Sequence, residues 1–136
     1  MISPTAATLR LFLHVLAATV WVGGQIVLAG LVGTVRRESP AALSAVARAF
    51  ARLAWPAFAV LVLTGIWNLT EVDLANTTTE YQVTVFVKVA VAVASGVFVL
   101  IHSLGKTKLA IALGGALGAL CSLAAVYLGI LLRTGT

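Results

Sequence analysis

The chain has 136 residues, of which 61% are hydrophobic and only 10% are charged, and its formal net charge is +5. Soluble domains carry about 25% charged residues. This composition, with a mean hydropathy of +1.10, therefore excludes a soluble enzyme and a protein that reads nucleic-acid bases. The single cysteine, Cys121, also excludes an internal disulfide framework. The length allows one domain, which we expect to lie in a membrane.

Four apolar segments are each long enough to cross a bilayer, whose hydrocarbon core needs about 20 helical residues. The predicted spans are residues 9–35, 53–70, 81–104 and 109–132. The first apolar segment is too long for a secretory signal peptide. The sequence therefore predicts an all-α, integral membrane four-helix bundle that forms a single domain over residues 1–136. We expect it to be a multi-pass protein of the inner (plasma) membrane, with the lipid bilayer and no nucleic acid as its partner.

The charged residues are sorted between the two ends of the spans. The basic residues beside the first and third connections are Arg36, Arg37, Arg48, Arg52, Lys106 and Lys108, whereas the loop after Thr70 carries Glu71, Asp73 and Glu80. Basic residues flank membrane spans mainly on the cytoplasmic side. This distribution places both termini on the non-cytoplasmic side.

The second span is predicted to begin as an amphipathic cytoplasmic extension over residues 41–52. Ser39 is a candidate N-cap, and Pro40 suits the first helical position. Pro56 lacks the N–H that would bond the carbonyl of Arg52, so we expect a kink near the membrane boundary.

The fourth span carries a stripe of small residues, which lets another helix backbone approach closely. The stripe consists of Gly114, Gly115, Gly118, Ser122, Ala125 and Gly129. We expect it to serve packing within the bundle, or association with a second copy or a larger membrane complex.

Three ionisable side chains lie within the predicted spans, where charge is costly and usually functional. His14 and Lys88 each lie roughly 9 Å from the outer end of their spans by helix rise, so they are level. His102 lies about 21 Å deeper than Lys88. The two histidines are therefore not expected to ligate the same iron.

Helical periodicity extends this pair into a predicted polar pocket in the outer half of the bundle. The residues expected to line it are Arg10, His14, Ala18, Trp21 and Gln25 in the first span, Thr64, Trp67 and Asn68 in the second, and Tyr127 in the fourth. His14 and Lys88 would lie at its centre, with Trp21 as its floor.

One sequence pattern resembles a known family. His14, Trp21, Gly23 and Gly24 form the pattern H-x6-W-x-G-G. Further matches are Pro56-x8-Gly65 in the second span, and Val87-Lys88-Val89 and His102 in the third. Over residues 9–103 the chain resembles the copper-resistance protein D (CopD) superfamily. In its length and its paired histidine and lysine it is similar to the HemJ branch of membrane protoporphyrinogen oxidases.

The HemJ resemblance implies bound haem b or another porphyrin and redox chemistry. It implies that His14 is an axial metal ligand and that Lys88 has a catalytic and cofactor-binding role. Imidazole suits haem iron as an axial ligand. Arg10, one turn above His14, is placed to bind a propionate. Trp21 and Asn68 complete the predicted cofactor-binding residues.

Two alternatives stay open. The CopD branch implies copper uptake, although copper(I) prefers thiolate and thioether ligands and the chain offers only Met1 and Cys121. The other alternative is a non-catalytic accessory subunit that docks on a larger membrane complex through its fourth helix.

Overall fold

The structure is a computed structural model that describes residues 2–135. Four of its helices are long and apolar enough to cross a membrane, and they are Ala6–Glu38, Pro40–Thr70, Thr79–Leu104 and Lys108–Thr134. No strand occurs within residues 2–135. The predictions of an all-α fold and of four membrane-spanning helices are therefore confirmed.

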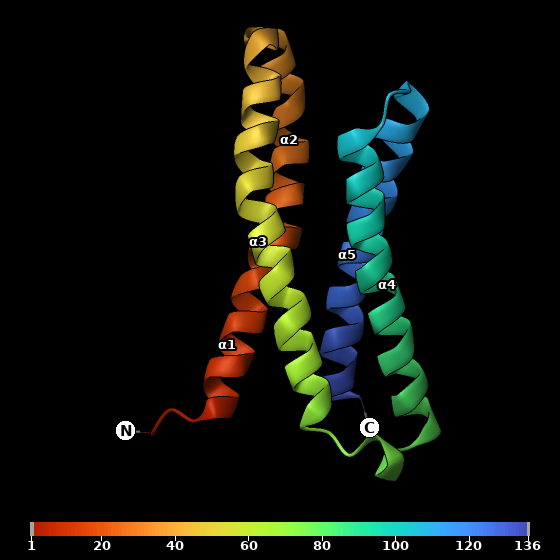
Figure 1. Cartoon of the computed structure of the whole chain (residues 1–136). Helices are drawn as coiled ribbons and strands as arrows, with labels where there is room; N and C mark the ends of the chain where they lie inside the picture. Colours follow the sequence, from red (N-terminus) through yellow and green to blue (C-terminus); the bar gives the residue numbers. More distant parts are fainter. Residues whose placement is uncertain (1, 136) are drawn as a thin grey trace. The chain divides into compact units, whose positions relative to one another are not determined.

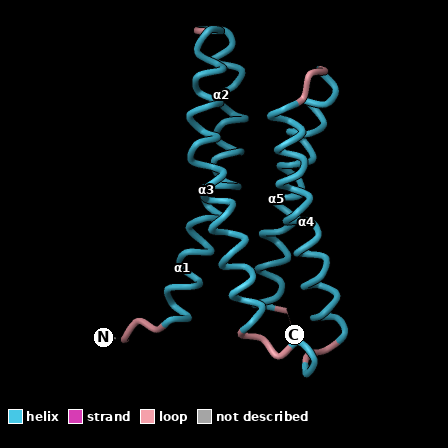
Figure 2. The backbone as a smooth tube through the Cα atoms, in the orientation of Figure 1, coloured by secondary structure: helices cyan, strands magenta, loops and turns pink. Residues whose placement is uncertain are grey.

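The helices form two compact units, one ending at Val72 and the other beginning at Asp73. Each unit is a pair of antiparallel helices joined by a short turn (Figures 1 and 2). These units are the first and the second hairpin. That the two hairpins join in a single domain stays a prediction.

The first span is not one regular α-helix. It consists of α1 (Ala6–Ala18), a π-helical segment (Thr19–Gly23) and α2 (Gly24–Glu38). A capping box begins α1, because the Thr5 side chain accepts a hydrogen bond from the Thr8 backbone N–H. The π-helical segment was not predicted, and Figure 1 shows α1 and α2 pointing in different directions on either side of it.

Side chains of the π-helical segment hold it against α3. Trp21 is only 1% exposed. Its ring centre lies 5.4 Å from that of Trp55 and 4.4 Å from that of Phe58. One helical turn after Trp21, a Cβ added to Gly24 would collide with the ring of Phe50. The widened turn and the glycine that follows it therefore let large aromatic rings fill the space between the two helices.

The second span begins with a single 3-10 turn, Pro40–Ala42, followed by α3 (Leu43–Thr70). Ser39 takes the N-cap position of that turn but makes no side-chain capping bond. Residues 43–52 are helical and continuous with the rest of the span. Pro56 lies inside α3 without ending it, and Figure 1 shows that α3 changes direction part-way along its length.

The second hairpin pairs α4 (Thr79–Leu104) with α5 (Lys108–Thr134). The two helices approach closely at Gly114, where an added Cβ would lie only 2.6 Å from the backbone nitrogen of His102. An added Cβ at Gly118 would lie 2.9 Å from Val99. Of the two uses predicted for the small-residue stripe, packing between helices is the one seen at these glycines. Association with a second copy or a larger complex stays a prediction.

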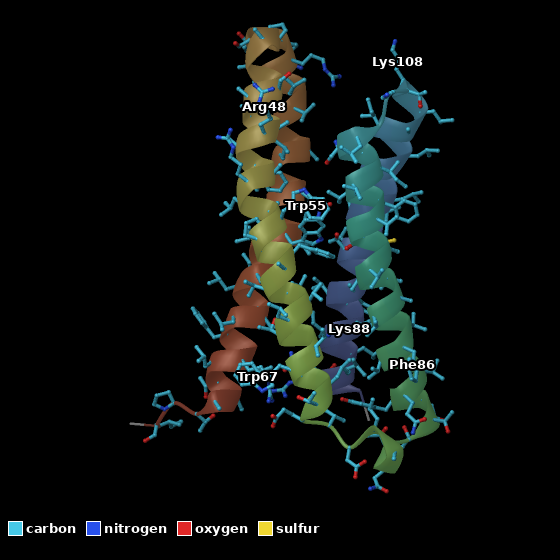
Figure 3. The ribbon with its side chains drawn as sticks, viewed as in Figure 1. Arg48, Trp55, Trp67, Phe86, Lys88 and Lys108 are labelled. Atoms are coloured by element: carbon cyan, nitrogen blue, oxygen red, sulfur yellow. The ribbon has the colours of Figure 1, made fainter. Side chains whose placement is uncertain are left out.

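Basic residues lie near the connecting turn of each hairpin. Arg36 and Arg37 are in the last turn of α2, and Lys108 begins α5. Glu71 and Glu80 lie at the opposite ends, after α3 and in the first turn of α4. In Figure 3, Arg48 and Trp67 mark the two ends of α3. The basic and acidic residues thus lie at opposite ends of the helices, as the sequence predicted. The non-cytoplasmic location of both termini stays a prediction.

Candidate functional site

His14 and Thr64 form a direct hydrogen bond between the two helices of the first hairpin. The His14 Nδ1 and the Thr64 Oγ1 are 2.8 Å apart. Thr64 is buried, with 5% of its surface exposed. The sequence predicted these residues at similar depth on neighbouring spans, and the structure brings them into contact.

The geometry around Thr64 identifies the donor in this bond. Its Oγ1 lies 2.7 Å from the carbonyl oxygen of Val60. A carbonyl oxygen can only accept a hydrogen bond, so the Thr64 hydroxyl donates its proton to Val60. Because Thr64 has one proton to donate, its bond with His14 must use a lone pair on Oγ1. His14 therefore donates from Nδ1–H. In the neutral imidazole, the lone pair then lies on Nε2.

Gly65 lies beside the His14 ring. A Cβ added at Gly65 would be 3.5 Å from the ring carbon Cε1, which is ordinary van der Waals contact. The helix backbone of α3 therefore lies against this face of the imidazole. Gly65 was singled out in the sequence only for its spacing from Pro56, and its position against His14 gives it a packing role.

Arg10 lies one turn before His14 in α1 and binds residues at the end of α3. Its Nη1 is 3.3 Å from Oε2 of Glu71, and its Cζ is 5.9 Å from the centre of the Trp67 ring. Its Nε is buried and has no hydrogen-bond partner within residues 2–135. The sequence predicted that Arg10 and Trp67 line the same polar pocket, but the pairing of Arg10 with Glu71 was not predicted.

The opposite charges of Arg10 and Glu71 could have signalled this ion pair. Arg10 begins the first predicted span, and Glu71 follows directly after the second. Two antiparallel spans bring these positions to the same end of a hairpin. The sequence does not fix the register of the two helices, so it does not determine that these two side chains meet.

Asn68 and Trp21 occupy different surroundings in the first hairpin. Asn68 is half-buried one turn after Thr64, on the side of α3 toward the Arg10 end. Trp21 belongs to the aromatic cluster with Trp55 and Phe58. Asn68 is thus near the predicted site along the helix, whereas the Trp21 ring lies in the packed core two turns from His14.

Lys88 lies within the second hairpin, on the side of α4 that faces α5. A Cβ added at Gly129 would lie 3.4 Å from both Cε and Nζ of Lys88. Lys88 forms no hydrogen bond or ion pair within residues 2–135. Figure 3 shows it along the length of α4 rather than at an end. Its predicted pairing with His14 would join the two hairpins and stays a prediction.

His102 joins the two helices of the second hairpin. Its Nδ1 donates to the carbonyl oxygen of Ile111 at 2.6 Å. Its ring also lies over Gly115, where an added Cβ would be 2.9 Å from Nδ1. His102 therefore has a packing function at the end of α4.

Tyr127 was expected to line the polar pocket, but its side chain is 66% exposed. Because Tyr127 belongs to the second hairpin and the other expected lining residues to the first, its place in that pocket stays a prediction. The Gln25 side chain forms a hydrogen bond with the helix backbone, because its Nε2 donates to the carbonyl oxygen of Trp21 at 2.8 Å. That bond supports the helix immediately after the π-helical segment.

His14 and Arg10 of the first hairpin carry chemical groups that suit a haem or porphyrin. His14 offers an imidazole whose Nδ1 is oriented by Thr64, and a second hydrogen bond of this kind is typical of ligating histidines. Arg10 has a buried N–H without an acceptor, which suits a carboxylate. No group of three or more His, Cys, Asp or Glu side chains is placed to hold a metal ion in the described part of the chain, but a haem iron needs only an axial ligand from the protein.

Comparison of the chain with models of protein families, with curated proteins and with solved structures gave no match. The resemblance to the CopD superfamily therefore stays a prediction from the sequence pattern.

Proposed function

We propose that this chain is a multi-pass protein of the inner (plasma) membrane that binds haem b or a related porphyrin through His14. The bond from His14 to Thr64 carries the proposal. It directs the proton of a neutral imidazole to Nδ1 and the lone pair to Nε2, the arrangement that an axial ligand needs.

A cationic side chain in the same hairpin as His14 supports a ligand with acidic groups. Arg10, one turn from His14, has a buried Nε–H that lacks an acceptor within residues 2–135. A carboxylate accepts strong, charge-assisted hydrogen bonds from a guanidinium. The catalytic and cofactor-binding role of Lys88, which lies within a span of the second hairpin, stays a prediction from the family resemblance.

The π-helical segment is a further support. It lies between His14 and α2, where it allows the aromatic cluster around Trp21 to fill the hairpin. Single-turn π-helical segments occur often at functional sites. A bound haem would supply electron transfer.

A visible absorption spectrum of the detergent-purified protein tests the proposal. We expect a Soret band, either as purified or after addition of haemin, and its loss in His14→Ala. His102→Gln is the matched control, because it alters the other histidine, which bonds to Ile111 in the second hairpin. The control should keep the Soret band.

The same measurement separates the alternatives. A colourless protein that does not take up haemin contradicts haem binding. If that protein binds copper(I), the copper-handling alternative replaces it. If it binds neither, the chain is better described as an accessory subunit of a larger membrane complex.

A further inference from the structure

The guanidinium of Arg10 has fewer hydrogen-bond partners than it has N–H donors. It contacts Glu71 through one nitrogen, Nη1, at 3.3 Å, and its buried Nε has no partner within residues 2–135. A guanidinium carries five N–H donors and binds carboxylates best through two of them at once. The single contact with Glu71 therefore leaves Arg10 able to bind a better-placed carboxylate.

The two members of this ion pair differ in how firmly they are held. The Arg10 side chain is 13% exposed and lies over the ring of Trp67. The Glu71 side chain is 52% exposed and belongs to the residue that caps the end of α3. Exposed ion pairs are weak because water solvates the released partner well. Glu71 can therefore swing into water while Arg10 stays in place.

We propose that Glu71 is a resident carboxylate that occupies Arg10 until a carboxylate of the ligand replaces it. This proposal rests on the proposed function, because it takes a porphyrin as the ligand. It adds that the Glu71 carboxylate competes with the carboxylate of the cofactor for Arg10. His14 and Arg10 lie on successive turns of α1, about 6 Å apart along the helix. A flat apolar molecule with an acidic edge therefore meets both.

The test compares metal-free protoporphyrin IX with its dimethyl ester, which has no free carboxylate. Binding in detergent is followed by quenching of tryptophan fluorescence, a signal that requires no iron and no axial ligand. The informative variant is Glu71→Gln, which keeps the shape of the side chain. Glu80→Gln is the matched control, because it removes the same charge from the first turn of α4 in the second hairpin.

We expect Glu71→Gln to bind protoporphyrin IX about twofold to fivefold more tightly than the unaltered protein, the range that loss of a weak ion pair gives. Its affinity for the dimethyl ester should not change. Glu80→Gln should match the unaltered protein for both ligands. Replacing Arg10 with Gln in the Glu71→Gln background should abolish the preference for the acid over the ester.

Other results overturn the proposal in distinguishable ways. If the porphyrin binds and Glu71→Gln has no effect, or the same effect on acid and ester, the exchange is wrong and haem binding stands. If neither porphyrin binds any variant, both the exchange and the proposed function are wrong. If the acid preference appears but haemin gives no His14-dependent Soret band, the exchange stands and iron ligation by His14 is wrong.

Discussion

At His14, a neighbouring hydroxyl group decides which ring nitrogen carries the proton. Thr64 uses its only proton on the carbonyl oxygen of Val60, so it can only accept from the imidazole. Partners of this kind fix the orientation of a ligating histidine and raise its basicity. In the proposed haem site, Thr64 should therefore affect the affinity for the cofactor without touching it.

Thr64→Val tests this role, because valine keeps the branched shape and removes the acceptor. We expect the affinity for haemin, measured by Soret titration, to fall about tenfold to a hundredfold, the range found for partners of metal-ligating histidines. Thr64→Ser keeps the hydroxyl group and should stay close to the unaltered protein. Equal affinities for the valine and serine variants would contradict the assignment of the proton to Nδ1.

Some of the site could be predicted from single residues and some could not. Helix rise placed His14 and Thr64 at similar depth, and periodicity placed Arg10 on the face of His14. The bond from Arg10 to Glu71 depends on the register of two helices in the hairpin. Periodicity within one helix does not determine that register, so the pair was missed.

Among the elements, the contact of α4 with α5 depends most on side-chain size. At Gly114 an added Cβ would meet backbone atoms of α4, the nitrogen of His102 at 2.6 Å and the carbonyl oxygen of Phe98 at 2.8 Å. Backbone atoms in a regular helix cannot move aside as the end of a long side chain can. The two helices would have to separate.

Gly114→Ala should therefore destabilise the protein by about 1–3 kcal/mol, as overpacking does in well-packed cores. Thermal unfolding in detergent is a suitable measurement. Gly30→Ala is the control, since an added Cβ there would meet nothing within 4 Å. The close approach at Gly114 would be refuted by a Gly114→Ala variant as stable as Gly30→Ala.

The helices themselves were predicted well because each is a long apolar segment bounded by charged residues. The π-helical segment was not predicted. Arg10, His14 and Trp21 follow the spacing of a regular α-helix, so the pattern contains no sign of an irregular turn. The cause is tertiary, since the segment packs its aromatic ring against Trp55 and Phe58 of α3.

For the whole molecule, charge sorting gives a testable orientation. The turn around Ser39 is basic, and the loop that contains Asn76 is acidic. The positive-inside rule therefore places Ser39 in the cytoplasm and Asn76 outside it. The contacts within each hairpin do not depend on which side faces the cytoplasm, so the fold alone does not decide the orientation.

Single cysteines introduced after replacement of Cys121 by Ala test this orientation. In right-side-out vesicles, a membrane-impermeant maleimide should label Asn76→Cys and not Ser39→Cys. Permeabilised vesicles, in which both positions are accessible, serve as the control. Labelling of Ser39→Cys alone in sealed vesicles would reverse the topology and place both termini in the cytoplasm.

The π-helical segment makes the first span sensitive to chain length as well as to residue type. A π turn contains one residue more than an α turn. Deleting one residue within Thr19–Gly23 would leave a regular helix of nearly unchanged composition. Because the lost residue is the extra one, everything beyond the segment would keep nearly its present rotation around the helix axis. Deleting one residue from α1 instead would rotate everything beyond it by about 100° around the helix axis. Gly24 would then turn away from Phe50, although neither residue had been altered.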